Sequence, residues 1–245
     1  MSERFIRAEM LRGKPAMEKL SSSSVAVFGL GGVGSWCAEA LSRCGVGEIT
    51  LIDHDIVSES NINRQLCAVS SSIGKAKAEV MAERLRDINP DISVHPIAAR
   101  YEPSVREQFF CRRYDYIVDC IDLVSCKLDL IETAASRGIP IVSALGAGNK
   151  TRAEDLKISD ISKTEGCPLA RVVRKELRKR GILHLPVVYS GESPLKPECE
   201  ETPPPGRRSI PGSLVWVTAT AGMLLCSHVV TQLTRQLMLE EKDII

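Results

Sequence analysis

The sequence lacks the features typical of secreted, membrane-spanning or zinc-binding proteins. Its 245 residues carry 32 basic and 31 acidic side chains, so a net charge of +1 provides no general attraction for nucleic acid. The charged start, Met1 to Phe5, contains no apolar signal segment. None of the nine cysteines belongs to a C-x-x-C pair, which disfavours zinc or a redox dithiol. We expect a cytoplasmic protein with reduced, mostly buried cysteines.

Aromatic residues and long apolar runs are also scarce. Only 4% of the residues are aromatic, although 44% are hydrophobic, which is enough for a globular core. One stretch, 213–230, has the length of a membrane helix, but serine, threonine, glycine and histidine interrupt it. We therefore expect a buried core helix over 213–235 and no membrane span.

A glycine-rich turn follows the first apolar run. The run "VAVFG" ends at Gly29, and Gly29, Gly31 and Gly34 match the pattern G-x-G-x-x-G, with Gly32 as a further residue without a side chain. Helical spacing of apolar residues continues to Cys44. Free backbone N–H groups and the helix dipole make such a helix start attractive to phosphate. The order strand, turn and helix therefore predicts a nucleotide site.

The rest of the first half alternates between strands and helices. Expected strands occupy 25–29, 48–53, 92–99, 114–122 and 139–146, and expected helices occupy 35–44, 74–89, 102–110 and 127–138. This alternation predicts a doubly wound, mainly parallel, Rossmann-like α/β sheet. Functional groups should gather at the carboxyl ends of its strands. Asp53 lies about 20 residues after the last glycine of the turn, where a ribose-binding acid is expected. Three further acids, Asp55, Asp119 and Asp122, also lie at or just after the ends of expected strands.

The residues after Asp53 separate two kinds of nucleotide chemistry. A dehydrogenase needs an apolar slot for nicotinamide, whereas a triphosphate needs considerable positive charge. The chain offers Asn61, Asn63, Arg64, Gln65, Lys75 and Lys77, and Asp122 could hold Mg²⁺. Each basic residue taken singly could belong to a solvated loop, but their combination with the strand ends favours attack on the α-phosphate of ATP.

Several motifs resemble the adenylating superfamily of ubiquitin-activating enzymes and of bacterial activators of sulfur-carrier proteins. These are "GLGGVGS", "LIDHDIVSESNINRQ", "SIGKAKAE" and "DCID", within residues 4–150. The resemblance implies an ATP site formed by Gly29, Gly31, Gly32, Gly34, Asp53, Asp55, Asn61, Arg64, Gln65 and Lys77, with Arg64, Lys77 and Asp122 as catalytic residues and Asp122 on Mg²⁺. The opening "RFIR" implies a homodimer in which Arg7 completes the other subunit's site.

The second half resembles one branch of that superfamily, the tRNA threonylcarbamoyladenosine dehydratases. The similarity includes "GAGNKTRAEDLKISDISKT" and "PLARVVRKELRKRG". It implies a ligase-like reaction that adenylates the carboxylate of threonylcarbamoyladenosine beside the tRNA anticodon and then closes a ring. The alternative is activation of a small ubiquitin-like or sulfur-carrier protein, although the zinc-binding C-x-x-C pairs of those activators are missing. A dehydrogenase and a non-catalytic scaffold are further alternatives, and a sulfur-transfer or carrier partner stays open.

The helix expected after Pro168 is strongly basic. Arg171, Arg174, Lys175 and Arg178 lie within it, and the three arginines share one face by their spacing. The stripe could bind the tRNA backbone or could be an ordinary solvated face. Cys167 replaces the aspartate of the dehydratase pattern at the cap position. Its presence there could cost cap stability, and the alternative is a reactive thiolate at the helix start.

We therefore divide the chain into three parts of one integrated domain. Residues 1–24 form a helical arm that reaches a partner subunit, and 25–150 form the ATP-binding core. Residues 151–245 form a basic, substrate-facing elaboration. It contains an exposed, mobile loop at 186–211, which includes Cys199 and is rich in proline and charge, and the helix at 213–235.

Overall fold

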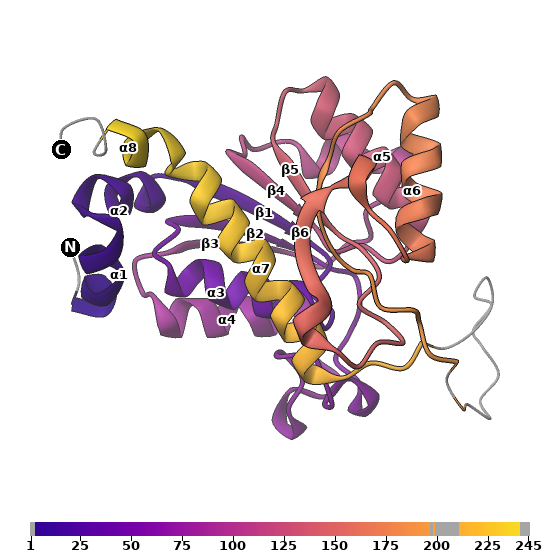
Figure 1. The fold of residues 1–245 in the computed structure, drawn as a ribbon. Helices are drawn as coiled ribbons and strands as arrows, with labels where there is room; N and C mark the ends of the chain where they lie inside the picture. Colours follow the sequence, from indigo (N-terminus) through magenta and orange to yellow (C-terminus); the bar gives the residue numbers. More distant parts are fainter. Residues whose placement is uncertain (1–2, 197, 199–210, 241–245) are drawn as a thin grey trace.

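A seven-stranded sheet runs through the middle of the molecule (Figure 1). The computed structural model describes residues 3–196, 198 and 211–240. In sheet order the strands are β3 (Ser93–Ile97), β2 (Glu48–Ile52), β1 (Ser24–Phe28), β4 (Tyr116–Asp119), β5 (Ile141–Ala144), β7 (Pro186–Ser190) and β6 (Leu156–Asp160). All neighbours pair in parallel except β6, which is antiparallel to β7. The predicted Rossmann-like sheet is confirmed.

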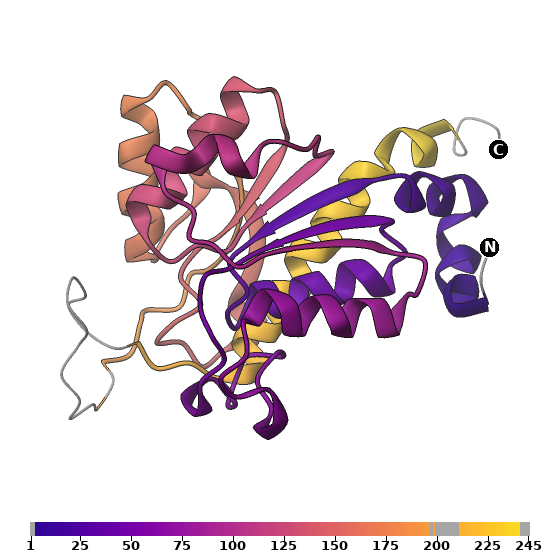
Figure 2. The same ribbon diagram turned by 180° about the vertical axis from the view of Figure 1, so that it is seen from behind.

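Helices cover both faces of this sheet, as a view from behind also shows (Figure 2). One face carries α3 (Gly34–Arg43), α4 (Lys77–Ile88) and α7 (Val215–Leu233), and the other carries α5 (Val124–Ser136), α6 (Pro168–Lys179) and the 3-10 helix η4 (Pro103–Phe109). Each face therefore has its own apolar cluster. Because both faces are covered, β1 and β4 are buried at every position, which explains why their sequences do not alternate with polar residues.

Two short helices form the N-terminal arm. These are α1 (Ile6–Arg12) and α2 (Lys14–Ser21), and they lie at the same end of the molecule as α8 (Arg235–Glu240) (Figure 1). A Cβ added at Gly45, just after α3, would lie 3.2 Å from the methyl carbon of Met17 and 3.7 Å from the ring of Phe5. The arm therefore packs at the carboxyl end of α3, whereas the glycine turn lies at its amino end.

The helix expected at 213–235 corresponds to α7, which packs closely against α3. A Cβ at Gly222 would lie 2.6 Å from the carbonyl oxygen of Val33, so the two helices approach within a distance that only glycine permits there. Over the described ranges, none of the helices combines the length and apolar character needed to cross a bilayer.

The short helix expected at 102–110 is confirmed as the 3-10 helix η4, in which Val105 has a non-helical φ of −121°. One sequence prediction differs from the structure. The prediction of an exposed loop from residue 186 was wrong for its first part, because Pro186–Ser190 form the interior strand β7. Proline is tolerated as the first residue of a strand, so it did not exclude one. Residues 199–210, including Cys199, lie outside the described residues.

Candidate active site

A cleft of about 1160 Å³ opens at the carboxyl ends of the parallel strands. It lies where β1 and β4 adjoin and the strand order reverses, which is the usual ligand position in doubly wound sheets. Of the predicted nucleotide-binding and catalytic residues, the fold brings Gly29, Gly31, Gly32, Asp53, Asp55, Asn61, Arg64, Gln65, Lys77 and Asp122 to its walls. Gly34 lies just behind the turn, and Arg7 is absent from the lining of its own cleft.

The glycines of the turn have distinct physical roles. Gly29 has a φ of +90°, and an added Cβ would lie 2.7 Å from the carbonyl oxygen of Cys120. A Cβ at Gly34 would lie 1.8 Å from the carbonyl oxygen of Gly29, so α3 could not begin so close to β1 with any other residue. At Gly31 an added Cβ would meet no atom within 4 Å. This open backbone at the start of α3 is where a phosphate can approach N–H groups.

Asp53 is held rigidly at the end of β2. One carboxylate oxygen accepts a hydrogen bond from the backbone N–H of Leu30 at 2.6 Å, and the other accepts one from the N–H of Asp55 at 2.8 Å. The residue is 9% exposed and lines the cleft. Its position beside the glycine turn supports the predicted ribose contact, since each oxygen has a second lone pair.

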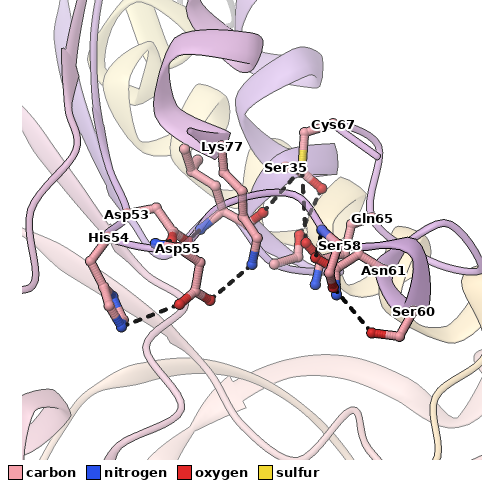
Figure 3. Close-up of polar contacts among 12 residues, drawn as sticks. Ser35, Asp53, His54, Asp55, Ser58, Ser60, Asn61, Gln65, Cys67 and Lys77 are labelled. Carbon is pink, nitrogen blue, oxygen red and sulfur yellow. Dashed lines mark hydrogen bonds and ion pairs between the residues drawn. The ribbon is translucent and has the colours of Figure 1, made fainter. Parts of the chain in front are cut away.

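Asp55 and Lys77 form an ion pair at the edge of the cleft (Figure 3). The ammonium nitrogen of Lys77 lies 2.9 Å from a carboxylate oxygen of Asp55, whose other oxygen lies 3.3 Å from the ring of His54. The Lys77 side chain is only 5% exposed, so its charge enters the cleft from a buried stem at the start of α4. Asp55 therefore positions Lys77 and also lines the cleft, so its contact with ATP stays a prediction.

The segment "SESNINRQ" folds into a compact turn around the 3-10 helix η2 (Glu59–Asn61). The Asn61 side chain accepts a hydrogen bond from the N–H of Ser58, and its backbone carbonyl accepts bonds from the N–H groups of Arg64 and Gln65. Asn61 and Gln65 are both buried beside the cleft, at 9% and 7% exposure. Figure 3 shows both lying beside Ser58 and Cys67.

The same turn is joined to the glycine loop through Ser35. Its hydroxyl donates to the carbonyl of Gly31 at 2.7 Å and accepts from the N–H of Leu66 at 3.1 Å. The indole N–H of Trp36 donates to the carbonyl of Arg64 at 3.0 Å. These bonds place the polar turn at a set position beside the phosphate-binding backbone.

The Arg64 guanidinium is oriented by its own turn. One nitrogen donates to the carbonyl of Ser60 at 3.0 Å and to the side-chain oxygen of Asn63 at 2.8 Å. A guanidinium has five N–H donors, so others stay available for a ligand in the cleft. The arrangement is suited to a planar, charge-assisted contact with phosphate oxygens.

Asp122 fits a magnesium ion shared with a triphosphate. It is exposed, lines the cleft after β4, and its carboxylate accepts no hydrogen bond from the described part of the chain. Mg²⁺ usually takes one or two protein carboxylates together with phosphate oxygens and water. Asp53, His54 and Asp55 also lie within ligand distance of one another, but their carboxylates already hold backbone N–H groups and Lys77.

The cleft also contains groups that the sequence did not single out. Arg100, which follows β3, lines it and pairs with Glu102 at 3.4 Å. Its place just beyond a predicted strand end could have marked it. Cys120 lines the cleft as well, but burial, and secondarily the nearby Cys37, raise the pKa of its thiol well above the ordinary value. Cys120 therefore stays protonated and is a poor nucleophile.

The basic stripe on α6 is narrower than expected. Arg174 is half-buried, and one of its guanidinium nitrogens donates to the carbonyl and the hydroxyl of Thr164 at 2.6 and 2.7 Å. This arginine therefore contributes to the fold. Arg171, Lys175 and Arg178 are exposed, and the helix begins at the cleft, where Pro168 and Leu169 line the wall.

Cys167 occupies the N-cap of α6, as predicted, but its side chain makes no cap hydrogen bond. The thiol is 5% exposed and lies under Gly146, where a Cβ would be 2.5 Å from the sulfur and 3.9 Å from the ammonium of Lys150. Burial lowers the pKa of Lys150, whose ammonium donates to the carbonyl of Ser190 at 2.6 Å. The residues that line the cleft do not include Cys167, which gives no support to a reactive thiolate.

Comparison of the sequence with known proteins identifies its family. Residues 4–243 match the model of the ThiF family. The chain is 40% identical to the tRNA threonylcarbamoyladenosine dehydratase of Bacillus subtilis over 97% of both chains, and 36% identical to that of Escherichia coli over 92% of this chain and 91% of the relative.

A solved structure agrees over almost the whole chain. It is the Escherichia coli tRNA N6-threonylcarbamoyladenosine dehydratase in complex with ATP, which covers 96% of each chain at 36% identity with a TM-score of 0.87. The same relative has also been solved in complex with AMP. By sequence and by fold, the chain belongs to the ThiF family and, within it, to the tRNA threonylcarbamoyladenosine dehydratases.

Proposed function

We propose that this protein catalyses the ATP-dependent dehydration of threonylcarbamoyladenosine beside the tRNA anticodon. ATP would adenylate the threonylcarbamoyl carboxylate, pyrophosphate would leave, and ring closure at the activated carbon would then release AMP. A carboxylate oxygen is a poor leaving group and AMP is a good one, so adenylation makes the loss of water feasible. The observation that carries the proposal is the match to the dehydratases over nearly the whole chain, and the cleft with its charged and polar lining agrees with it.

The cleft residues suit the first step. The open backbone at Gly31 and the start of α3 would hold phosphates, and Asp53 would accept bonds from the ribose hydroxyls. Arg64 and Lys77 would balance the charge that develops as pyrophosphate departs. Asp122 would hold Mg²⁺, which supplies further charge neutralisation when bound. Asn61 and Gln65 would complete the phosphate contacts.

A homodimer fits the position of Arg7. Arg7 is exposed in the N-terminal arm and does not line its own cleft, so it could act only on the site of a second copy. The same helix, α1, presents apolar side chains to solvent, with Ile6, Met10 and Leu11 at 49%, 70% and 85% exposure. Burial of these side chains against a partner subunit would remove an exposed apolar surface from water.

The exposed face of α6 is the proposed contact for the tRNA backbone. Arg171, Lys175 and Arg178 extend along one side of the helix from its start at the cleft. A nucleoside placed in the cleft would bring neighbouring phosphates toward this face. Replacing Arg171 and Arg178 with Glu should weaken tRNA binding and reduce its salt dependence, since each lost phosphate contact lowers the slope by about one. Unchanged binding would remove the stripe from the interface.

Mass spectrometry of tRNA tests the activity directly. Incubation of tRNA that carries threonylcarbamoyladenosine with ATP and protein should remove the mass of one water molecule, and Arg64→Ala should abolish this change. Arg113→Ala is the matched control, because Arg113 precedes β4 at the opposite end of the strand from the cleft and should leave the yield unchanged. ATP–pyrophosphate exchange that depends on a small carrier protein, with no change in tRNA mass, would contradict the proposal and favour carrier activation.

A further inference from the structure

One wall of the cleft lies beyond the residues that the nucleotide would occupy. It is formed by Gly146, Ala147 and Gly148 after β5, and by Pro211 and Ser213 before α7. We call these two segments, 146–148 and 211–213, the acceptor wall. The glycine turn, Asp53 and the polar turn of Arg64 are on the side assigned to the nucleotide, so the acceptor wall, together with the start of α6, is available to the group that attacks ATP.

Asn149 holds the two segments of this wall together. Its backbone N–H donates to the carbonyl of Gly212 at 2.8 Å, and its side-chain oxygen accepts from the N–H of Gly212 at 2.6 Å. Its own carbonyl accepts from the N–H of Leu195 at 2.8 Å. One residue therefore joins three segments that are distant in sequence, and two of them line the cleft.

The backbone of Asn149 is in an unusual conformation. Its φ of +60° is the only positive φ among the non-glycine residues that the structure describes. Asparagine tolerates this left-handed region better than most side chains. A β-branched or aliphatic residue could neither adopt this conformation without strain nor supply the oxygen that accepts from Gly212. Asparagine satisfies both requirements at this position.

The wall is reinforced at its far side. The buried Glu192 carboxylate accepts hydrogen bonds from the N–H and hydroxyl of Thr151 and from the N–H of Arg152, at 2.9 to 3.1 Å. The indole N–H of Trp216, at the start of α7, donates to the carbonyl of Thr151 at 2.8 Å. The residues after Asn149 are thus fixed, so a change at Asn149 would act on the segment that precedes it.

The acceptor wall is also bonded to the phosphate-binding turn. The side-chain amide of Asn63 donates to the carbonyl of Ser213 at 3.0 Å, and its oxygen accepts from Arg64 at 2.8 Å. A path of hydrogen bonds therefore runs from Asn149 through the 212–213 backbone and Asn63 to the Arg64 guanidinium. The Arg64 guanidinium also bonds the carbonyl of Ser60, so its position does not depend on the wall alone.

We propose that Asn149 is a positioning residue for the acceptor carboxylate, and this inference rests on the proposed function. By fixing the spacing between the 146–148 and 211–213 segments, it sets how the threonylcarbamoyl group approaches the α-phosphate. Attack on phosphorus requires the entering and leaving oxygens to be nearly in line, and a misplacement of about 1 Å can cost about 100-fold in rate.

Variants at two positions separate this role from general stability. Asn149→Gly keeps the positive φ and removes only the side-chain acceptor, whereas Asn149→Asp keeps an acceptor oxygen. In Gly148→Ala every hydrogen bond is retained, but the new Cβ would lie 3.2 Å from that of Pro211 and push the wall outward. We expect Asn149→Gly and Gly148→Ala to lower kcat/KM for modified tRNA at least about 10-fold, with Asn149→Asp within about 3-fold of the wild type.

The affinity for ATP separates a positioning role from a purely structural one. A structural defect would weaken ATP binding, whereas a misplaced acceptor would not. Titration with ATP should give a Kd within about 2-fold of wild type for all three variants, because none of them removes a group on the nucleotide side and Arg64 keeps its bond to the carbonyl of Ser60. Wild-type kcat/KM for Asn149→Gly and Gly148→Ala in an enzyme that cyclises tRNA would overturn the inference alone. Equal losses of ATP affinity and of kcat/KM would also overturn it. A wild-type protein that makes no cyclic product would overturn the proposed function and the acceptor role with it.

Discussion

The buried ion pair between Lys127 and Asp119 should be essential for stability. The ammonium of Lys127 lies 2.6 Å from the carboxylate, both side chains are 0% exposed, and the same ammonium donates to the carbonyl of Ala144. Lys127→Met keeps a similar volume but leaves a carboxylate buried without its counter-charge. Removing one partner of a buried pair typically costs about 3–5 kcal/mol. This is a large part of the roughly 5–15 kcal/mol that stabilises an ordinary domain.

Urea denaturation followed by circular dichroism measures this loss. The double variant Asp119→Asn, Lys127→Met should recover much of it, because the amide oxygen can still accept from the N–H of Ile121, as Asp119 does at 3.0 Å. Lys14→Met is the control, since Lys14 belongs to an exposed pair and should change stability by less than about 0.5 kcal/mol. A loss below about 1 kcal/mol for Lys127→Met would refute the reasoning.

Three further predictions concern the glycine turn and two titrating sites. Gly34→Ala should abolish detectable ATP binding in an equilibrium titration, because its Cβ would lie 1.8 Å from the carbonyl oxygen of Gly29; wild-type affinity would contradict this. Burial lowers the pKa of His228 in the folded protein, so as the pH falls through about 6.5 the unfolded chain binds a proton at this residue before the folded chain does. The free energy of unfolding measured in urea should therefore fall in this pH range, and His228→Gln should make it depend less on pH. A hydrogen bond from Cys226 lowers the pKa of Cys44 to about 7, so alkylation of Cys44 by iodoacetamide should rise between pH 6 and 8. Peptide mass spectrometry should follow Cys44 itself, because Cys111 is also exposed, and Cys226→Ala should move the rise to higher pH.

Much of the fold could be predicted because its signals are local. The uninterrupted apolar runs of β1 and β4, the glycines before α3 and the spacing to Asp53 each depend on a few neighbouring residues. The strand β7 was missed because it lies in a sequence rich in proline and charge. Its assignment as an interior strand depends on pairing with β5 and β6, which are distant along the chain.

The candidate site was predicted as a set of residues, but the partners of individual side chains within the fold were not. Asp55 pairs with Lys77, and Arg174 bonds Thr164. In both cases a charged side chain found a partner that sequence spacing alone does not reveal. Asn149 lacked any local signal, since its bonds to Gly212 and Leu195 arise only when three separate segments meet.

The sequence alone therefore determined the sheet, the nucleotide-binding turn and the kind of chemistry, because these depend on backbone conformation and charge within short segments. It also contained the motifs by which the family could be identified. Only the tertiary structure decided which cations are free and which are paired, and how the acceptor wall is assembled. Those properties depend on distances between residues far apart in the chain, and hydrogen bonds and ion pairs form only when folding brings the partners within about 3–4 Å.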